Sequence, residues 1–224
     1  MEKVLANAFP SLPQSHIPSL PLQTDAFILL KRPPTDAYQS FAVFSPEHGA
    51  HTVLQRLSKK SATTSVALDL FDEVSLQLES SNQGRTWFVK EARLAKRHPA
   101  LGRSYETLRH ASALAALIAR NPVHEDSRTA VAALLRGALA AFADGAHPDL
   151  VFFKSLYRFA RDEGYPVKQQ WLPSLPKDLR TEAERLLRTP LAELEKSKIE
   201  NPKSKILERR LEDYLRGHTE ILLD

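Results

Sequence analysis

The sequence predicts an α+β protein in two parts, a small closed β-barrel followed by an all-α helical bundle. Between residues 25 and 97, apolar and polar side chains alternate with the period of β-strands. From residue 98 onward, apolar side chains recur every three or four positions, which is the period of an α-helix. We therefore predict an N-terminal arm at 1–24, a barrel domain at 25–97 and a helical domain at 98–224.

Six short runs in the barrel region have the composition of β-strands. Turn-forming residues separate them, as in Lys31-Arg32-Pro33-Pro34 and Ser80-Ser81-Asn82-Gln83-Gly84. Closure of such strands into a barrel would leave no exposed sheet edge. The predicted strands are 26–30, 38–44, 52–57, 66–70, 74–78 and 85–94.

The helical region divides into five predicted helices, while the N-terminal arm has no stable period. Pro10, Pro13, Pro18 and Pro21 interrupt the arm, so we expect it to be poorly ordered. Prolines suit the first turn of a helix and glycines suit its end, and residues of both kinds mark the helix limits here. The predicted helices are 105–118, 127–143, 148–164, 177–188 and 201–217.

Composition excludes several classes of function. The chain has no cysteine, so disulfides, thiolate zinc sites and cysteine nucleophiles are absent. No apolar run approaches the roughly 20 residues of a membrane helix, and no signal-peptide core is present, so we expect a cytoplasmic protein. The glycine-rich loops that bind nucleotides are also missing. We predict no cofactor and no metal.

No catalytic constellation is apparent, and we predict that the protein is not an enzyme. His48 and His51 form a His-x-x-His pair beside Glu47. A zinc site would need further ligands held rigidly, and a histidine in a turn more often faces solvent or caps the turn. Ser61 and Ser65 have no evident partner for nucleophilic catalysis.

Basic residues around the predicted barrel are candidates for phosphate contacts. The net charge is only +4 with a pI of about 9.3, which permits binding to nucleic acid without requiring it. Lysine and arginine neutralise phosphates and release counterions, so such binding falls steeply with salt. The alternative is a set of ordinary solvated side chains. The candidates are Lys31, Arg32, Arg56, Lys59 and Lys60, extended by Lys90, Arg93, Lys96 and Arg97 at the junction with the helices.

Aromatic residues on the predicted barrel are candidates for stacking on bases. Such stacking contributes about 1–3 kcal/mol per base in barrels that bind single strands. Because a strand alternates its faces, most of these rings belong to the barrel core. We expect Tyr38 and Trp87 to be the members that face outward.

Several motifs resemble the RecO family of bacterial recombination mediators, in the same order and with similar spacing. Phe44-Ser45-Pro46-Glu47-His48-Gly49 resembles the family's phenylalanine-threonine-x-glutamate-x-glycine turn, and Glu163-Gly164-Tyr165-Pro166 resembles its glycine-tyrosine-x-proline helix end. Other segments match the first strand, the basic loop, the leucine-x-proline-phenylalanine strand and the junction into the helices. These segments are Ala26-Phe27-Ile28-Leu29-Leu30, Leu57-Ser58-Lys59-Lys60-Ser61, Leu68-Asp69-Leu70-Phe71 and Glu91-Ala92-Arg93-Leu94.

The resemblance implies an OB-fold in the N-terminal domain and a function in DNA repair and recombination. It implies binding of single- and double-stranded DNA, annealing of complementary strands, and loading of the recombinase together with RecR. The sequence departs from the family at two places. Val167-Lys168-Gln169-Gln170-Trp171 stands where many members have a four-cysteine zinc module, and Pro34-Thr35-Asp36-Ala37 replaces a charged first loop.

The resemblance also implies a partner peptide. In the family, the acidic and apolar tail of single-strand-binding protein docks on the helical domain, which requires an apolar pocket with a basic rim. Residues of the predicted third helix have this character, although its phenylalanines also suit the core of the bundle. The candidates are Phe153, Tyr157, Arg158 and Arg161.

The sequence thus predicts a non-enzymatic DNA-binding protein of the nucleoid that promotes strand pairing. The alternative is a protein-interaction scaffold whose barrel no longer binds nucleic acid and whose helical face recruits a partner. Binding of oligonucleotides that depends on salt distinguishes the two.

Overall fold

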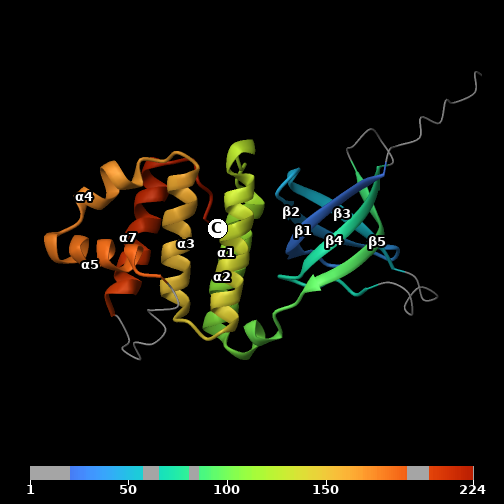
Figure 1. Ribbon diagram of the computed structural model, residues 1–224, viewed down its shortest axis with the longest axis horizontal. Helices are drawn as coiled ribbons and strands as arrows, with labels where there is room; N and C mark the ends of the chain where they lie inside the picture. The colour runs from blue at the N-terminus through green and yellow to red at the C-terminus, as the bar shows by residue number, and fades with distance from the viewer. Residues whose placement is uncertain (1–20, 58–65, 81–85, 191–201, 224) are drawn as a thin grey trace, which may run out of the picture.

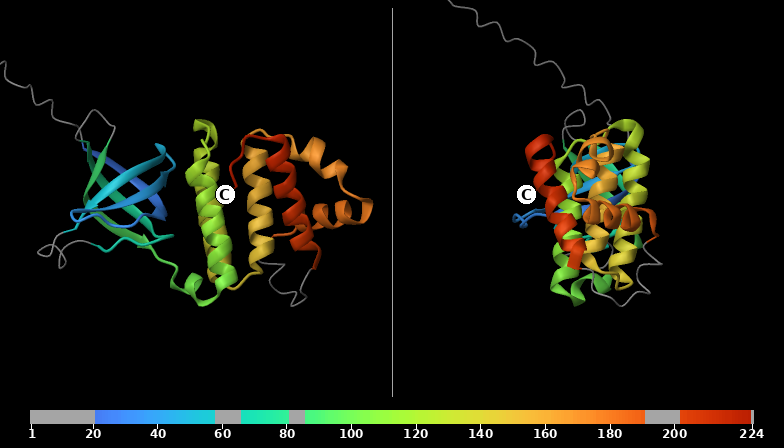
Figure 2. Two further views of the ribbon diagram at one scale, coloured as in Figure 1. Left: turned by 180° about the vertical axis from the view of Figure 1, so that it is seen from behind. Right: turned by 90° about the vertical axis from the view of Figure 1, so that its left-hand side faces the viewer.

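The computed structural model describes residues 21–57, 66–80, 86–190 and 202–223. It has the α+β organisation that the sequence predicts, with strands in the first part of the chain and helices in the second. Figure 1 shows the strands gathered at one end of the molecule and the helices stacked beside them. Helices α1 and α2 stand next to the barrel, and the remaining helices lie on their far side (Figure 2).

Five strands form a closed barrel in the order β1-β2-β3-β5-β4. They are β1 (Leu22–Lys31), β2 (Tyr38–Ser45), β3 (Gly49–Arg56), β4 (Glu73–Ser80) and β5 (Trp87–Lys96). Strand β1 pairs with both β2 and β4, and these ladders are antiparallel, whereas β3 and β5 pair in parallel. Strand β1 begins at Leu22, so the barrel starts before the limit of residue 25 that the sequence predicts; residues 1–20 of the predicted arm lie outside the described residues.

The predicted strand at 66–70 is wrong. In the structure, residues 66–69 have no regular secondary structure and lead into a turn at Leu70 and Phe71. The alternation that suggests a strand arises because Val66 and Leu68 both face the barrel interior, whereas Leu70 is 36% exposed and Phe71 packs against the helices. Phe71 has φ of 67°, a left-handed conformation that is unfavourable for a bulky residue. Contacts on both sides of the turn must therefore hold it in place.

An ion pair between a buried carboxylate and a partly exposed arginine fastens this segment to the end of β5. The side chain of Asp72 is fully buried and accepts hydrogen bonds from Arg97 Nε at 2.8 Å and Arg97 Nη2 at 2.6 Å. It also accepts from the backbone N–H of Asp69 at 2.8 Å, while Arg97 Nη2 donates to the Ala67 carbonyl at 2.7 Å. Arg97, a predicted DNA contact, therefore has a structural role.

All five predicted helices are present. They are α1 (Tyr105–Arg120), α2 (Arg128–Ala143), α3 (Pro148–Asp162), α5 (Lys177–Arg188) and α7 (Pro202–His218). Ser104 caps α1, because its side chain accepts a hydrogen bond from the Thr107 N–H. Tyr105, which the helical period places inward, is instead 77% exposed. At the first position of the helix it lies beyond the edge of the packed face, which begins at Thr107.

Shorter turns connect these helices. The sequence did not predict the π-helical turn at Val167–Trp171, which leads into α4 (Leu172–Ser174). Two 3-10 turns, Pro99–Arg103 and Glu125–Ser127, precede α1 and α2.

The barrel and the helices share one apolar core. Phe27 and Leu29 of β1, Phe44 of β2 and Phe71 lie on the outside of the barrel and belong to the same buried cluster as α1, α2 and α3. A second cluster fills the barrel interior, where it includes Ile28, Phe41, Val53, Val74 and Leu76. Because outer side chains of the barrel are covered by helices, the two predicted domains form a continuous packed body.

The turn between β2 and β3 belongs to this contact. Ser45 Oγ accepts hydrogen bonds from the N–H groups of Glu47 and His48, which fixes the turn. Arg128 Nη1, at the start of α2, donates to the Glu47 carbonyl at 3.0 Å. Gly49 has φ of +73°, and a Cβ atom there would lie 3.1 Å from Arg128 Nε, so conformation and space both favour glycine. The turn faces α2 and is not an open hairpin tip.

We predict that Arg97→Met lowers the free energy of unfolding by about 2 kcal/mol, because the buried Asp72 carboxylate loses its cation. The matched control is Arg93→Met on the same strand, whose arginine is exposed, and for which we expect a change within about 0.5 kcal/mol. Urea unfolding followed by circular dichroism measures both. Equal effects of the two substitutions would show that the ion pair does not stabilise the barrel.

Candidate nucleic-acid interface

The outward side chains of β2, β3 and β5 form the candidate interface. Strand alternation sends Phe41 and Val43 of β2 and Val53 of β3 into the barrel. Their neighbours in sequence therefore point outward. We call the outward set Tyr38, Leu54, Arg56 and Phe88 the β2–β3–β5 face.

Strand register brings these four residues together. Tyr38 pairs with Arg56, and Leu54 pairs with Phe88. The rings of Tyr38 and Phe88 have centroids 5.5 Å apart and planes inclined by 59°, which is a favourable tilted contact. Tyr38, Leu54 and Phe88 are each partly exposed, and Arg56 is exposed. The face therefore offers an aromatic pair with an apolar neighbour and a cation.

Trp87 does not take the outward position that the sequence predicts. It pairs with the inward Val53 and packs, together with Val89, against the barrel core. Its neighbour Phe88 occupies the outward position instead. The signal was present in the sequence, because Trp87 and Val89 share one side of the strand and Phe88 the other. Only the pairing with β3 decides which side faces the core.

The predicted cations fall into two groups in the structure. Lys31 lies 3.2 Å from Asp69, Lys90 pairs with Glu79, and Arg97 pairs with Asp72, so carboxylates already neutralise these three. The other group is exposed and comprises Arg32, Arg56, Arg93 and Lys96. Among the described residues, no carboxylate lies within ion-pair distance of these four side chains. Lys59 and Lys60 lie outside the described residues.

The described residues of the barrel carry no excess of positive charge. These residues, 21–57, 66–80 and 86–97, contain seven lysines and arginines and eight aspartates and glutamates. The expected attraction for phosphate must therefore come from the local placement of the unpaired cations beside the aromatic pair. Arg32 lies just after β1, and Arg56 ends β3.

The predicted peptide site on α3 requires correction. Phe153 is fully buried and Tyr157 is 7% exposed, and their rings pack against Trp171 at centroid distances of 6.1 and 5.9 Å. Arg158 and Arg161 both form ion pairs with Asp162. Neither aromatic ring is available to a peptide, because the π-helical turn covers this side of α3. The sequence gives helical spacing but not the element that packs on each face.

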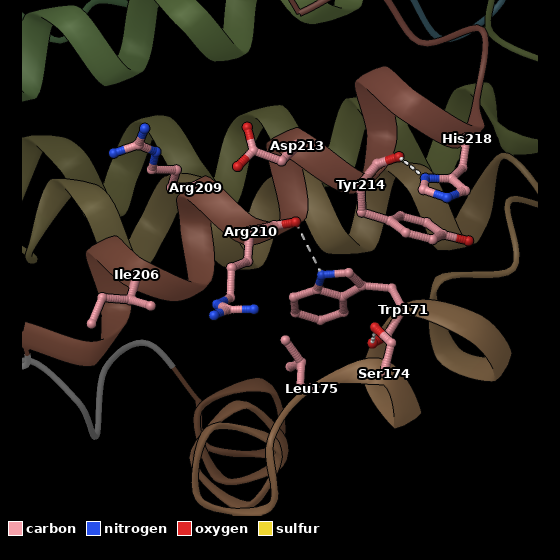
Figure 3. Close-up of a pocket in the computed structure, with 9 residues that line it drawn as sticks. All are labelled: Trp171, Ser174, Leu175, Ile206, Arg209, Arg210, Asp213, Tyr214 and His218. Carbon is pink, nitrogen blue, oxygen red and sulfur yellow. Dashed lines mark hydrogen bonds between the residues drawn. The ribbon is translucent and has the colours of Figure 1, made fainter.

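A pocket beside this cluster has the character that a peptide site needs. It lies between α7 and the segment that contains Trp171, Ser174 and Leu175, and its volume is about 640 Å³. We call it the α7 pocket. Figure 3 shows Arg210 extending from α7 into the space between Ile206 and Trp171. The pocket is lined by Trp171, Ser174, Leu175, Ile206, Arg209, Arg210, Asp213, Tyr214 and His218.

The walls of the α7 pocket are held by hydrogen bonds and stacking. Trp171 Nε1 donates to the Arg210 carbonyl at 3.3 Å, which joins the two sides (Figure 3). Tyr214 and His218 stack with ring centroids 4.7 Å apart. Ile206 is 46% exposed. Within the part of the chain that the structure describes, Arg209 and Arg210 have no carboxylate at ion-pair distance. An apolar floor thus lies beside two available cations.

His48 and His51 do not form a metal site with the neighbouring acid. His48 Nε2 lies 3.6 Å from Glu47, whereas His51 Nδ1 lies 3.2 Å from the Gly49 carbonyl. Burial lowers the pKa of His51 by more than the hydrogen bond to Gly49 raises it. Among the described residues, no group of three or more histidine, aspartate or glutamate side chains is placed to hold a metal ion.

Residues 167–171, which stand where many RecO-family members have a zinc module, contribute to the apolar core in this structure. Val167 and Trp171, at the two ends of the π-helical turn, are both buried.

Across the residues that the structure describes, no helix is long and apolar enough to cross a membrane.

The scan of protein-family models found no match to this chain, and the search of curated proteins found no relative. The resemblance to the RecO family therefore rests on the motifs quoted above.

We predict that Trp87→Ala costs more stability than Phe88→Ala, because only Trp87 packs against the barrel core. Truncation of a large aromatic side chain in a core costs about 3 kcal/mol, and we expect about 1 kcal/mol at Phe88. Chemical unfolding of both variants measures the difference. A larger cost at Phe88 would reverse the assignment of the two faces of β5.

Proposed function

We propose that this chain is a non-enzymatic DNA-binding protein of the RecO type, with an OB-fold barrel that binds DNA on the β2–β3–β5 face. The observation that carries the proposal is the pair of Tyr38 and Phe88 beside Arg56 on the outside of a closed five-stranded barrel. In OB-folds, the face of strands 2 and 3 and the loops beside it bind oligonucleotides. Both rings offer a surface on which bases stack.

The available cations support the same binding mode. Arg56 lies beside the aromatic pair, and Arg32 stands in the connection between β1 and β2, which is one of the two loops that OB-folds use. Together with Arg93 and Lys96 they would contact phosphates of single-stranded or double-stranded DNA, while the rings take unpaired bases. Cations that screen the repulsion between phosphates would also lower the barrier to strand annealing.

The resemblance supports proposals about partners and location. The protein would act in the cytoplasm at the nucleoid, together with RecR, and help load the recombinase on DNA coated by single-strand-binding protein. We place the acidic tail of that protein in the α7 pocket and not on α3. Ile206 and Leu175 would contact its apolar side chain, and Arg210 would contact its carboxylate.

One observation favours the alternative of a protein-interaction scaffold. Lys31, Lys90 and Arg97, three of the predicted phosphate contacts, are already paired with carboxylates. A face with a tyrosine, a phenylalanine and a leucine also suits a protein partner, since aromatic residues are enriched in such interfaces. The alternative predicts no binding to DNA even at low salt.

We predict that Phe88→Ala weakens binding to a labelled single strand about tenfold, which corresponds to the loss of about 1.4 kcal/mol of stacking. The salt dependence should stay unchanged, because no phosphate contact is lost. Fluorescence anisotropy at several salt concentrations measures both quantities. Arg56→Ala should instead reduce the slope of log affinity against log salt by about 0.7.

The control for Arg56 is Lys168→Ala, which removes an exposed cation of the helical part. The affinity of the Lys168→Ala variant for DNA, and the dependence of that affinity on salt, should match those of the unmodified protein. If the unmodified protein does not bind DNA in dilute buffer, the proposal fails and the scaffold remains. If it binds but Phe88→Ala and Arg56→Ala have no effect, DNA lies on another surface.

We predict that Arg210→Ala weakens binding of a synthetic peptide with an acidic, apolar C-terminus by about tenfold, because a charge-assisted hydrogen bond contributes about 1.5 kcal/mol or more. Arg158→Ala is the matched control, since its guanidinium pairs with Asp162 on α3. Isothermal titration calorimetry compares the two variants. If Arg158→Ala weakens peptide binding and Arg210→Ala does not, the peptide binds on α3 and not in the α7 pocket.

A further inference from the structure

His110 lies buried where α1, α3 and α7 meet. Its side chain is 3% exposed, and its ring contacts Phe152 of α3 with centroids 5.7 Å apart. The Nδ1 atom lies 2.8 Å from the Glu106 carbonyl. Because a carbonyl oxygen only accepts hydrogen bonds, Nδ1 carries a hydrogen whether the ring is neutral or charged. Any change of protonation therefore takes place at Nε2.

Two groups of opposite character compete for Nε2. Arg109 Nη2, on α1, lies 3.0 Å away, and Glu208 Oε1, on α7, lies 3.3 Å away. A neutral ring accepts a hydrogen bond from Arg109 and turns a lone pair toward the Glu208 carboxylate. A protonated ring donates to Glu208 and can no longer accept from Arg109. The hydrogen-bond partner of His110 Nε2 thus depends on whether this atom carries a proton.

We propose that His110 is a proton-operated latch that ties α7 to α1 when Nε2 is protonated and loosens this tie when the proton leaves. The contact is between helices that are distant in sequence, and Glu208 is 9% exposed, so the bond forms away from bulk water. The latch itself does not depend on the proposed function.

The other charged groups of this region divide between the two sides of the latch. A groove of about 420 Å³ runs along His110 and gives protons access to it. On α3, Asp149 accepts a hydrogen bond from Ser204 of α7, which is a second tie to the same helix. The charged groups that face the groove are Glu106 and Arg109 of α1, Asp149 of α3, and Lys205, Glu208, Arg209, Glu212, Asp213 and Arg216 of α7.

The direction of the pKa shift agrees with this geometry. Burial lowers the pKa of His110, but the hydrogen bonds to Glu208 and to the Glu106 carbonyl outweigh it, and the pKa is raised overall. A raised pKa in the folded state stabilises the fold fully below the unfolded value of about 6.5. This contribution is lost as the pH rises through the folded value. The tie between α1 and α7 is therefore stronger in acid.

The test is NMR of the full chain, with the imidazole nitrogen shifts of His110 followed from about pH 5.5 to about pH 8.5. We expect the pKa of His110 to lie above the ordinary histidine value. Glu208→Gln should lower its pKa, since the acceptor loses its charge, and Arg109→Met should raise it, since the neutral ring loses its donor. His124→Gln, an exposed histidine, is the control and should leave the titration of His110 unchanged.

Hydrogen exchange of the α7 amides, corrected for intrinsic rates, provides the second measurement. It should be several-fold slower at the acidic end in the unmodified protein, and this difference should disappear in Glu208→Gln. The proposal is overturned if Glu208→Gln leaves the pKa of His110 unchanged. It is also overturned if the exchange difference persists in that variant, because protonation would then act on α7 through other groups.

Discussion

The packing of aromatic and aliphatic side chains from the outside of the barrel against α1 and α2 is the contact on which the rest of the structure depends. Phe27, Leu29, Phe44 and Phe71 are all at most 5% exposed and belong to the core of the helices. Burial of each such side chain stabilises the fold by about 1.5–3 kcal/mol. Arg136 of α2 strengthens the contact, since it lies 5.4 Å from the Phe27 ring and pairs with Glu73.

This contact also decides which part of the barrel stays accessible. Strand β2 passes from one environment to the other, because Phe44 near its end is buried under the helices while Tyr38 at its start is partly exposed. Tyr38 has the same outward orientation as Phe44, six residues away along the strand. The helices therefore cover one end of β2 and leave the other end, with Leu54 and Phe88 beside it, open to a ligand.

The sequence predicts periodic features well and packing partners poorly. Helices α2 and α3 begin and end close to the predicted limits, since Gly145 follows the end of α2 and Pro148 and Gly164 mark the two ends of α3. Tertiary contacts decide the features that were predicted wrongly. At 66–70, Val66 and Leu68 face the barrel interior without belonging to a strand, because the chain then turns at Leu70 and Phe71. The burial of Phe153 depends on Trp171, which the chain reaches only after a turn of a kind that has no clear sequence signal.

Tertiary contacts also decide the role of each charged residue, because the neighbours of a lysine or arginine determine whether its charge is available to a ligand. Arg56 and Arg97 are equivalent in sequence as basic residues near strand ends. In the structure, Arg56 is exposed beside an aromatic pair, whereas Arg97 satisfies a buried carboxylate. Among the described residues, the predicted cations that remain for a polyanion are the four without such a partner, and these are too few for charge alone to select DNA. The stacking surface of Tyr38 and Phe88 is therefore the more specific element of the proposed interface.

Helix α7 connects the two features of the helical part. Leu207, Leu211 and Leu215 form its buried stripe. Ile206, Arg210 and Tyr214 follow each other at intervals of four residues on one side of this stripe and line the α7 pocket, whereas Glu208 and Glu212 lie on the other side and line the groove at His110. A helix moves largely as a unit, so a change in the tie at Glu208 shifts the pocket wall as well. Protonation of His110 would thus act on the proposed peptide site without any contact with the peptide.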